Sequence, residues 1–262
     1  MPESPASRIK LQIDGALATV ILDRAEKLHA LTPEMMETLA GIAARIDADA
    51  GIRCVILTAA GDKAFCVGAD INAWAALEPL DMWRSWVRRG HQVFDRWARL
   101  RVPVIAAING HAIAGGMEIV QGTDIRVAVP TAKFGVQEVK WALFPAGGSS
   151  VRLPLQLPYA KAMELLLTGD LITADEALAL GFLNYVTEDV MGRALEIAHK
   201  IAANGPLAVK AIRASVKACL GKPEAEALAL ETQFSGPVFL TEDAKEGPRA
   251  FLQKRAPVYR GQ

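Results

Sequence analysis

The feature that most constrains this chain is a stretch in which glycines open the backbone between two glutamates. Within residues 103–150, the small-residue step at 114–116 stands directly before a predicted helix that carries Glu118. Glu138 follows 20 residues later, beyond an apolar segment at 125–129 that predicts a strand. A strand between the two glutamates allows the chain to bring both of them back to the same place.

This pattern has a specific chemical meaning. The first amides of a helix have no partner inside the helix, and glycines leave such amides uncovered by side chains. Uncovered amides can hold an oxygen that gains negative charge, and two carboxylates beside it suit proton transfer next to a carbonyl. From the residues alone, a glycine packing step with two surface glutamates remains an equal alternative.

Length and composition limit the possible classes of protein. A chain of 262 residues, 52% of them hydrophobic, can form one large domain, or one domain with an appendage, and can leave apolar surface for subunit contacts. The 29 basic and 29 acidic residues balance, which gives no net attraction for nucleic acid or an anionic membrane. We therefore expect neither as a partner.

The cysteines and the first residues bear on the cellular compartment. The three cysteines are scattered and form no CxxC pair, which favours a reducing compartment over a disulfide framework. The first ten residues are polar and lack the apolar core of a secretory signal, and no apolar run approaches membrane-spanning length. The sequence predicts a cytoplasmic protein.

Strands and helices are predicted to alternate and then give way to helices. A hairpin around Asp14-Gly15, a helix capped by Thr32, a strand at 54–57 and a helical stretch broken near Pro79 precede the glycine-rich stretch. The recurrence of strand, turn, glycine step and helix suggests stacked ββα units. Further helices are expected at 158–167 and 173–180 and a strand at 183–186, followed by helices at 189–203, 206–219, 223–234 and 241–253. We expect two parts, 1–190 and 191–262.

Other chemistries find little support. The chain contains neither GxxxxGK[ST] nor GxGxxG, and its four histidines have no metal-ligand spacing, so no metal site is expected. A serine nucleophile at Ser149 or Ser150 with His111 as its base lacks the GxSxG elbow. Tryptophans and arginines mix at 74–97, but the neutral chain argues against base stacking and favours core packing or a lid.

Seven ordered segments of the chain form a recognisable series. They are DRAEKLHAL at 23–31, AFCVGADI at 64–71, AAINGHAIAGGMEI at 106–119, TDIRVA at 123–128, KFGVQEV at 133–139, LLLTGDLITADEALALGFLNYV at 165–186 and AFLQKRAPVYRG at 250–261. With these segments the chain resembles the enoyl-CoA hydratase/isomerase, or crotonase, superfamily, and the resemblance runs from about residue 9 to residue 259.

The resemblance implies an α/β crotonase fold, a ββα superhelix with two near-perpendicular sheets followed by a C-terminal helical trimerisation region. It also implies an acyl-CoA thioester substrate, a homotrimer or dimer of trimers, and no cofactor beyond the coenzyme A of the substrate. By the family's motifs, the backbone amides of Val67 and Gly115 would form the oxyanion hole, and Glu118 and Glu138 would be catalytic.

The family also implies contacts with coenzyme A. Matched by motif, the contact residues would be Lys27, Leu28, Ala30, Gly68, Ala69 and Asp70, with Phe251 and Lys254 reaching the coenzyme from a neighbouring subunit.

The presence of both glutamates favours hydration of a trans-2-enoyl-CoA to a 3-hydroxyacyl-CoA. Glu118 would activate water for attack at C3, and Glu138 would deliver the proton at C2. Isomerisation, dehydration of a hydroxyacyl-CoA, thioester hydrolysis and non-catalytic acyl-CoA binding remain as alternatives. The sequence departs from the family near the acyl pocket, which leaves the acyl group open: His29 replaces Asn, Gln121 and Gly122 replace small apolar residues, and PAGGSS follows Trp141-Ala142.

Overall fold

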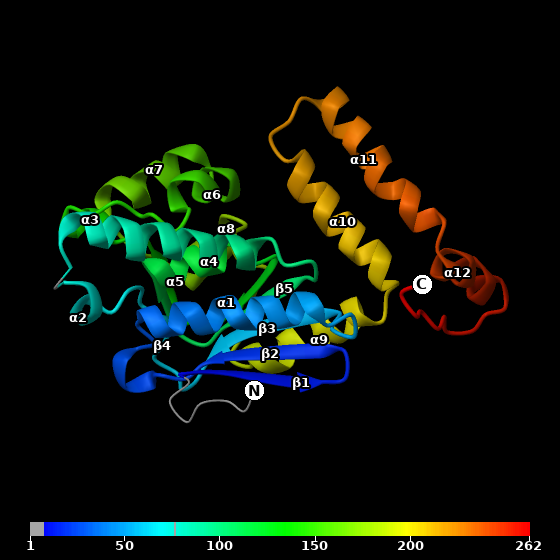
Figure 1. Cartoon of the computed structure of the whole chain (residues 1–262), viewed down its shortest axis with the longest axis horizontal. Coiled ribbons are helices and arrows are strands. Elements are labelled where there is room, and N and C mark those ends of the chain that lie inside the picture. Colours follow the sequence, from blue (N-terminus) through cyan, green and yellow to red (C-terminus); the bar gives the residue numbers. More distant parts are fainter. Residues whose placement is uncertain (1–7, 76) are drawn as a thin grey trace.

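The larger of two sheets forms the base of the molecule in the computed structural model, which describes residues 8–75 and 77–262 (Figure 1). Its strand order is β1-β2-β3-β5-β7-β10, and every pair is parallel except the β1–β2 hairpin. The hairpin turns at Gly15, as its Asp-Gly signal predicts. The strands are Ile9–Asp14 (β1), Leu17–Leu22 (β2), Cys54–Ala59 (β3), Val104–Ile108 (β5), Ile125–Ala128 (β7) and Tyr185–Val186 (β10).

Both faces of this sheet are covered by helices. In β3, Val55 and Leu57 join the core that includes α1 (Pro33–Ala48) and α4 (Arg88–Ala98), whereas Cys54 and Ile56 join a second cluster with α9 (Val190–Ala202). Side chains of a strand alternate between faces, so two covered faces require a continuous apolar run. This explains why all six residues of β3 are buried.

The smaller sheet collects the second strand of each repeating unit. Its order is β4-β6-β8-β9, with bounds Ala64–Cys66, His111–Ile113, Lys133–Gly135 and Ile172–Thr173. Thus β3, β5 and β7 enter the large sheet, while their successors β4, β6 and β8 enter the small one. The predicted ββα repeat is confirmed. Strands β6 and β8 were not predicted one by one, because three-residue strands are too short to show a period.

Short helices connect these strands. The Thr32 cap is confirmed, and the helical stretch before β5 begins anew at Pro79 as predicted. Thr173 caps α8 in the same way. Helix α6 was not predicted, because Pro154 lies inside it. The remaining elements are α2 (Ile71–Trp74), α3 (Pro79–Asp81), a π-helical turn (Met82–Val87), α5 (Gly115–Gln121), α6 (Ser149–Gln156), α7 (Tyr159–Thr168) and α8 (Ala174–Ala179), with 3-10 turns at Ala25–Lys27 and Glu138–Trp141.

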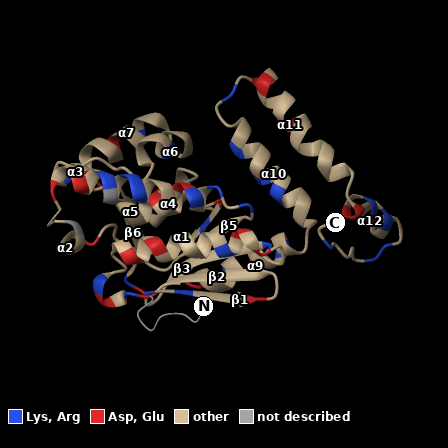
Figure 2. Ribbon diagram, in the orientation of Figure 1, with Lys and Arg blue, Asp and Glu red and all other residues tan. Residues whose placement is uncertain are grey.

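Three C-terminal helices extend away from the sheets as an arm (Figure 1). They are α10 (Pro206–Cys219), α11 (Glu224–Phe239) and α12 (Glu242–Leu252), close to their predicted bounds. Only Pro206, Asp243 and Ala250 of these helices are buried. Much of α11 carries no charge (Figure 2). The predicted division after residue 190 stays a prediction, and α9 itself packs on the large sheet.

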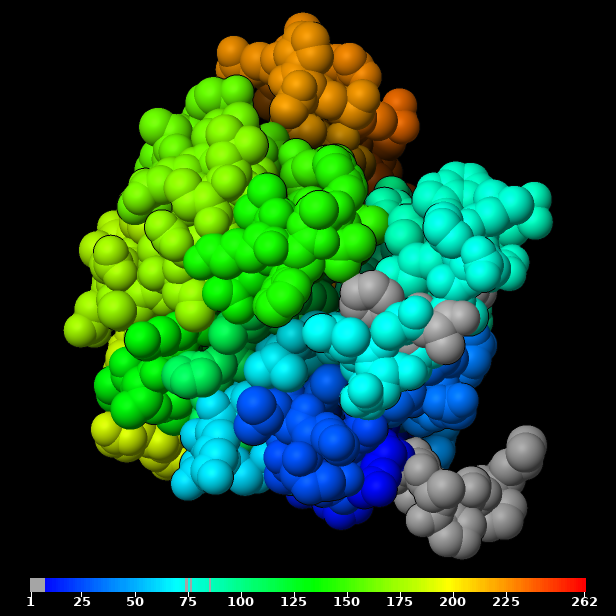
Figure 3. Space-filling view, turned by 90° about the vertical axis from the view of Figure 1, so that its left-hand side faces the viewer, coloured from blue at the N-terminus to red at the C-terminus, as the bar shows by residue number. Residues whose placement is uncertain are grey.

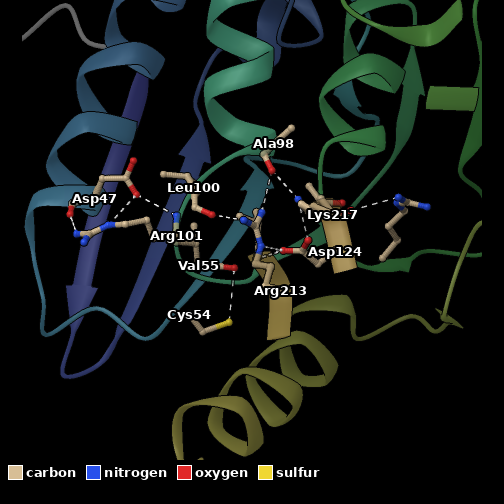
Figure 4. Close-up of polar contacts among 12 residues, drawn as sticks. Asp47, Cys54, Val55, Ala98, Leu100, Arg101, Asp124, Arg213 and Lys217 are labelled. Atoms are coloured by element: carbon tan, nitrogen blue, oxygen red, sulfur yellow. Dashed lines mark hydrogen bonds and ion pairs between the residues drawn. The ribbon is translucent and has the colours of Figure 1, made fainter. Parts of the chain in front are cut away.

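A half-buried aspartate anchors the arm to the sheets (Figure 4). Asp124 Oδ2 lies 2.7 Å from Arg213 Nε, and its Oδ1 lies 3.1 Å from Lys217 Nζ. The same carboxylate accepts a hydrogen bond from Val104 N at 2.8 Å. Arg213 and Lys217 also donate to the Ala98 carbonyl at the end of α4, where the helix leaves its acceptors unpaired. One carboxylate therefore ties α10 to the start of β5.

Candidate active site

Three parallel strand ends meet at one edge of the small sheet. Strand β4 pairs with β6, and β6 pairs with β8, so the chain leaves all three strands in the same direction. The segments that follow are Val67-Gly68, Ala114-Gly115 and Gln137-Glu138. The carboxyl ends of parallel strands are where α/β proteins place their ligands. The strand order of the small sheet therefore brings the glycine step at 114–116 close to Glu138.

Glycine allows the first two of these segments to touch. Gly68 has φ +97°, and a Cβ added to it would lie 2.8 Å from Ala114 Cβ and 3.0 Å from Gly115 N. A Cβ on Gly116 would overlap with the carbonyl oxygen of Cys66. Ala114 itself has φ +53°, a conformation that costs a non-glycine residue free energy and often occurs at functional sites.

Two backbone amides remain unpaired at this contact. Within the described residues, neither the Val67 nor the Gly115 N–H donates to an acceptor of the protein. Both residues line the main cavity of the structure. Unpaired N–H groups that face a cavity are suited to hold an oxygen of a ligand.

Glu118 is buried and held by backbone donors. It lies in the first turn of α5 and is 4% exposed. Its Oε1 accepts from Gly147 N at 2.6 Å and from Ser149 N at 3.4 Å. Burial and the facing Glu138 raise the pKa of Glu118 to about 7, although these hydrogen bonds act in the opposite direction. A carboxyl with this pKa can exchange a proton near neutral pH.

The segment that holds Glu118 is fixed from behind. Arg152 Nη1 donates to the Gly147 carbonyl at 2.9 Å, and its Nη2 lies 3.3 Å from Asp95 Oδ1. A Cβ on Gly147 would overlap with Glu118 Oε2 and with the ring of Phe94. Glycine at 147 is therefore required for the observed position of the carboxylate.

Glu138 has a different environment. It begins the 3-10 turn after β8, and its Oε2 is buried without a hydrogen-bond partner in the described part of the chain. Burial raises the pKa of this carboxyl, because the charged form loses its water. Both glutamates line the same cavity.

The cavity has a volume of about 880 Å³ and mostly apolar walls. Aromatic side chains from the stretch before α4 and from the segment after Glu138 contribute much of the wall, and Trp141 and Phe144 are each 71% exposed. In Figure 3, the cyan segment near residue 70 and the green segment near residue 145 border a hollow on this face. Such a wall suits a hydrocarbon group. The lining aromatics are Trp83, Trp86, Phe94, Trp141 and Phe144.

The predicted coenzyme-contact loop lies beside the unpaired amides. Leu31 pairs with Ala69 and donates to the Gly68 carbonyl at 2.7 Å, which places the preceding residues next to the strand ends. Ala69 lines the cavity, and Leu28 is 41% exposed with φ +50°. The predicted coenzyme contacts Lys27, Leu28 and Ala30 do not line the cavity.

His29 supports this loop from within. Its Nδ1 accepts from Arg24 N at 3.0 Å, and its Nε2 lies 2.8 Å from the Ala60 carbonyl oxygen, so the ring proton belongs on Nε2. The side chain is buried, and burial lowers its pKa. His29, where the family usually has Asn, is therefore explained as a neutral side chain that links the loops of Arg24 and Ala60.

Three other predicted residues do not face the cavity in this chain. Asp70 caps α2 by accepting from Asn72 N and forms an ion pair with Arg24 at 2.7 Å. Phe251 is 82% exposed near the end of α12, and Lys254 follows that helix, on the arm and away from the two sheets (Figure 1). Their predicted contact with coenzyme A requires a neighbouring subunit and stays a prediction.

From the sequence alone, Gly147 and Gln121 are only departures from the family's pattern, and Ser149 is only a weakly supported nucleophile. In the structure Ser149 is fully buried, receives a hydrogen bond from Gln121 and has none to His111 among the described residues. The Gly-Gly-Ser run at 147–149 could have indicated these donors to Glu118, because glycines before a helix leave its first amides uncovered.

Two kinds of feature are absent from the described residues, 8–75 and 77–262. No cluster of three or more His, Cys, Asp or Glu side chains there could hold a metal ion. No helix in that part of the chain is both long and apolar enough to cross a membrane.

Known proteins match nearly the whole length of this chain. A model of the enoyl-CoA hydratase/isomerase family matches residues 12–262. The chain is 47% identical to the enoyl-CoA hydratase EchA19 of Mycobacterium tuberculosis over 94% of its length and 93% of the relative. It is 37% identical to the short-chain-enoyl-CoA hydratase of Clostridium acetobutylicum, over 95% of this chain and 96% of that relative.

Solved structures agree with these sequence matches. The crystal structure of an enoyl-CoA hydratase from Bacillus anthracis superposes with a TM-score of 0.95 at 34% identity and covers 98% of this chain and 100% of that one. The expected crotonase-type α/β fold, with its two sheets and C-terminal helices, is confirmed.

Proposed function

Because the chain belongs to the enoyl-CoA hydratase/isomerase family, we propose that this enzyme adds water to a trans-2-enoyl-CoA and forms a 3-hydroxyacyl-CoA. The observation that carries the proposal is that Glu118 and Glu138 line one cavity together with two unpaired amides. Hydration needs a base for water, an acid for carbon and donors for the thioester oxygen, and this cavity offers a candidate for each.

The amides of Val67 and Gly115 would hold the thioester oxygen. When water attacks C3, the electrons of the double bond move toward the thioester and its oxygen gains enolate charge. Donors already in place stabilise that charge without reorganisation, and one such donor typically contributes about 10²–10³ in rate.

The glutamates would divide the proton transfers. Ionised Glu118 takes a proton from water while the oxygen bonds to C3, and protonated Glu138 then gives its proton to C2 of the enolate. The product gains one water in total, and the two carboxyls exchange protonation states. The pKa of Glu118, raised to about 7, supports this division, because that carboxyl can change protonation state near neutral pH. Burial raises the pKa of Glu138 as well, which favours its protonated form. No cofactor is needed, since coenzyme A belongs to the substrate.

We further propose that the enzyme works as a trimer or a dimer of trimers. The support is the arm, whose helices expose large apolar side chains such as Ile212, Phe239 and Leu240. Contact with a neighbour would bury them and could bring Phe251 and Lys254 of one copy to the coenzyme of another. Light scattering should give a trimer or a multiple of three, and a stable, active monomer would exclude this arrangement. The cytoplasm remains the predicted compartment.

An assay with a panel of acyl-CoA thioesters tests the function. Incubation of trans-2-enoyl-CoA with the protein should remove the enoyl absorbance and yield the 3-hydroxyacyl-CoA. Free coenzyme A would instead indicate a thioester hydrolase, and a shifted double bond without added water would indicate an isomerase. Tight binding of the same thioesters without turnover would indicate a non-catalytic binding protein.

A further inference from the structure

A buried pair of polar side chains lies directly behind Glu118. Gln121 Nε2 donates to Ser149 Oγ at 3.0 Å, and the two residues are 2% and 0% exposed. Ser149 also donates its backbone N–H to Glu118, and its side chain lies close enough to that carboxyl to lower its pKa. Gln121, one turn further along α5, does not line the cavity.

The orientation of the Gln121 amide follows from a count of donors and acceptors. As placed, its Oε1 is buried and unpaired within the described residues. The reversed amide would bury an NH₂ group with two donors beside the same neighbours, which is worse. With the lone pair of Ser149 Oγ accepting from Gln121, the hydroxyl proton of Ser149 is left to donate to another acceptor.

The buried amide is costly for stability. A buried, unpaired carbonyl oxygen destabilises the folded state, and an apolar side chain of the same volume would avoid that cost. The presence of an amide at Gln121 is explained if it orients the Ser149 hydroxyl, to which it donates a hydrogen bond.

We propose that Gln121 is a positioning residue for catalysis, which directs the hydroxyl of Ser149 toward the Glu118 carboxylate. The hydroxyl then adds to the backbone donors from Gly147 and Ser149, and all three stabilise the ionised form that acts as base. This inference rests on the proposed function, since it concerns the base of that reaction.

Other charges near Glu118 stay the same when Gln121 is replaced. Glu138 faces it across the cavity, Arg152 lies behind Gly147, and Asp95 pairs with Arg152. His91, from α4, also lines the cavity and hydrogen-bonds the Ala146 carbonyl.

The test is the pH dependence of kcat/KM for Gln121→Met, which keeps the volume and removes the donor. Protonated Glu118 cannot act as base, so activity falls as the pH drops through its pKa. Weakening a donor to the carboxylate favours the protonated form, so the acidic limb should move upward by about 1 pH unit. The rate at pH 9 should change little. The matched control is Gln156→Met. This variant loses the hydrogen bond from Gln156 to the Gln121 main-chain carbonyl and keeps the hydrogen bond from Gln121 to Ser149, so the acidic limb of the pH profile should not move.

Ser149→Ala removes the hydroxyl and keeps the backbone N–H, so it should shift the limb at least as far. Because Gln121 acts through Ser149, the double variant should match Ser149→Ala alone. Additive shifts, or an unmoved limb in Gln121→Met, would overturn the inference. If Gln121→Met does not fold, an unmoved limb in Ser149→Ala overturns it equally. Wild-type protein without hydratase activity would contradict the proposed function instead.

Discussion

The segments that surround the two glutamates differ in what they offer a negative charge. Glu118 is held by the N–H groups of Gly147 and Ser149, on a loop fixed by Arg152. Glu138 begins a single 3-10 turn, and its Oε2 has no partner among the described residues. Donors to a carboxylate favour the ionised form, whereas burial without donors favours the protonated one.

This difference is consistent with the roles that the proposed mechanism gives to the two carboxyls. The carboxyl with preorganised donors suits the base, because it must carry charge before it accepts a proton. The carboxyl that buries one oxygen without a donor suits the acid, because burial favours its protonated form. Enzymes commonly separate an acid from a base in this way, by giving two similar groups different surroundings.

Replacing each glutamate by glutamine should have the largest effect. Glu118→Gln keeps hydrogen bonding and removes the base, so the hydration rate should fall by about 10² or more, with enoyl-CoA binding largely retained. Glu138→Gln should cost at least as much, because it removes proton delivery to C2. Steady-state hydration of an enoyl-CoA by both variants measures this.

A side activity would sharpen the same comparison. Moving a double bond needs one base that shuttles a proton, so any isomerase activity should depend strongly on Glu138 and less on Glu118. If Glu118→Gln hydrated at a rate near that of the wild type, the two-glutamate mechanism would be wrong, and a single-base isomerase would replace it.

The sequence predicted the parts of the site that depend on local pattern. The step at 114–116 with its uncovered helix amides and the two glutamates follow from glycine spacing and helix geometry, and the hairpin and the Thr32 cap follow from turn chemistry. The family resemblance added Val67 and Gly115 as the specific donors, and the Val67 amide lies where β4 ends beside β6.

The groups that hold Glu118 could not be predicted in the same way. Gly147 and Ser149 lie 29 and 31 positions from it, and only the packing of α6 against α5 brings them together. The contact of Asp124 with Arg213 and Lys217 spans a still longer separation. A hydrogen bond between distant segments leaves no periodic signal in the sequence.

The free energy of unfolding should also depend on pH because of the environment of Glu118. The pKa of Glu118 rises from 4.5 to about 7 on folding, so between these values the unfolded chain loses its proton first and stability falls as the pH rises. The loss above pH 7 is on the order of 3 kcal/mol. Glu118→Gln should therefore be more stable than the wild type at pH 8 and similar to it at pH 4.5. Urea unfolding at both pH values measures this, and a stability gain that is the same at both would contradict it.

The smallest expected effect comes from moving Glu118 without removing it. In Gly147→Ala the new methyl group would overlap with Glu118 Oε2 and with Phe94, so the carboxylate must shift from its donors. A misplaced catalytic group typically costs up to about 10², and we expect a tenfold to hundredfold fall in kcat. The matched control is Gly41→Ala in α1, where nothing lies within 4 Å of the added Cβ. That variant should keep its kcat and gain roughly 0.5–1 kcal/mol, because alanine favours a helix over glycine. Equal kcat values for the two variants would show that the position of Glu118 does not limit the reaction, and the contrast between the two carboxylates would then lose its catalytic meaning.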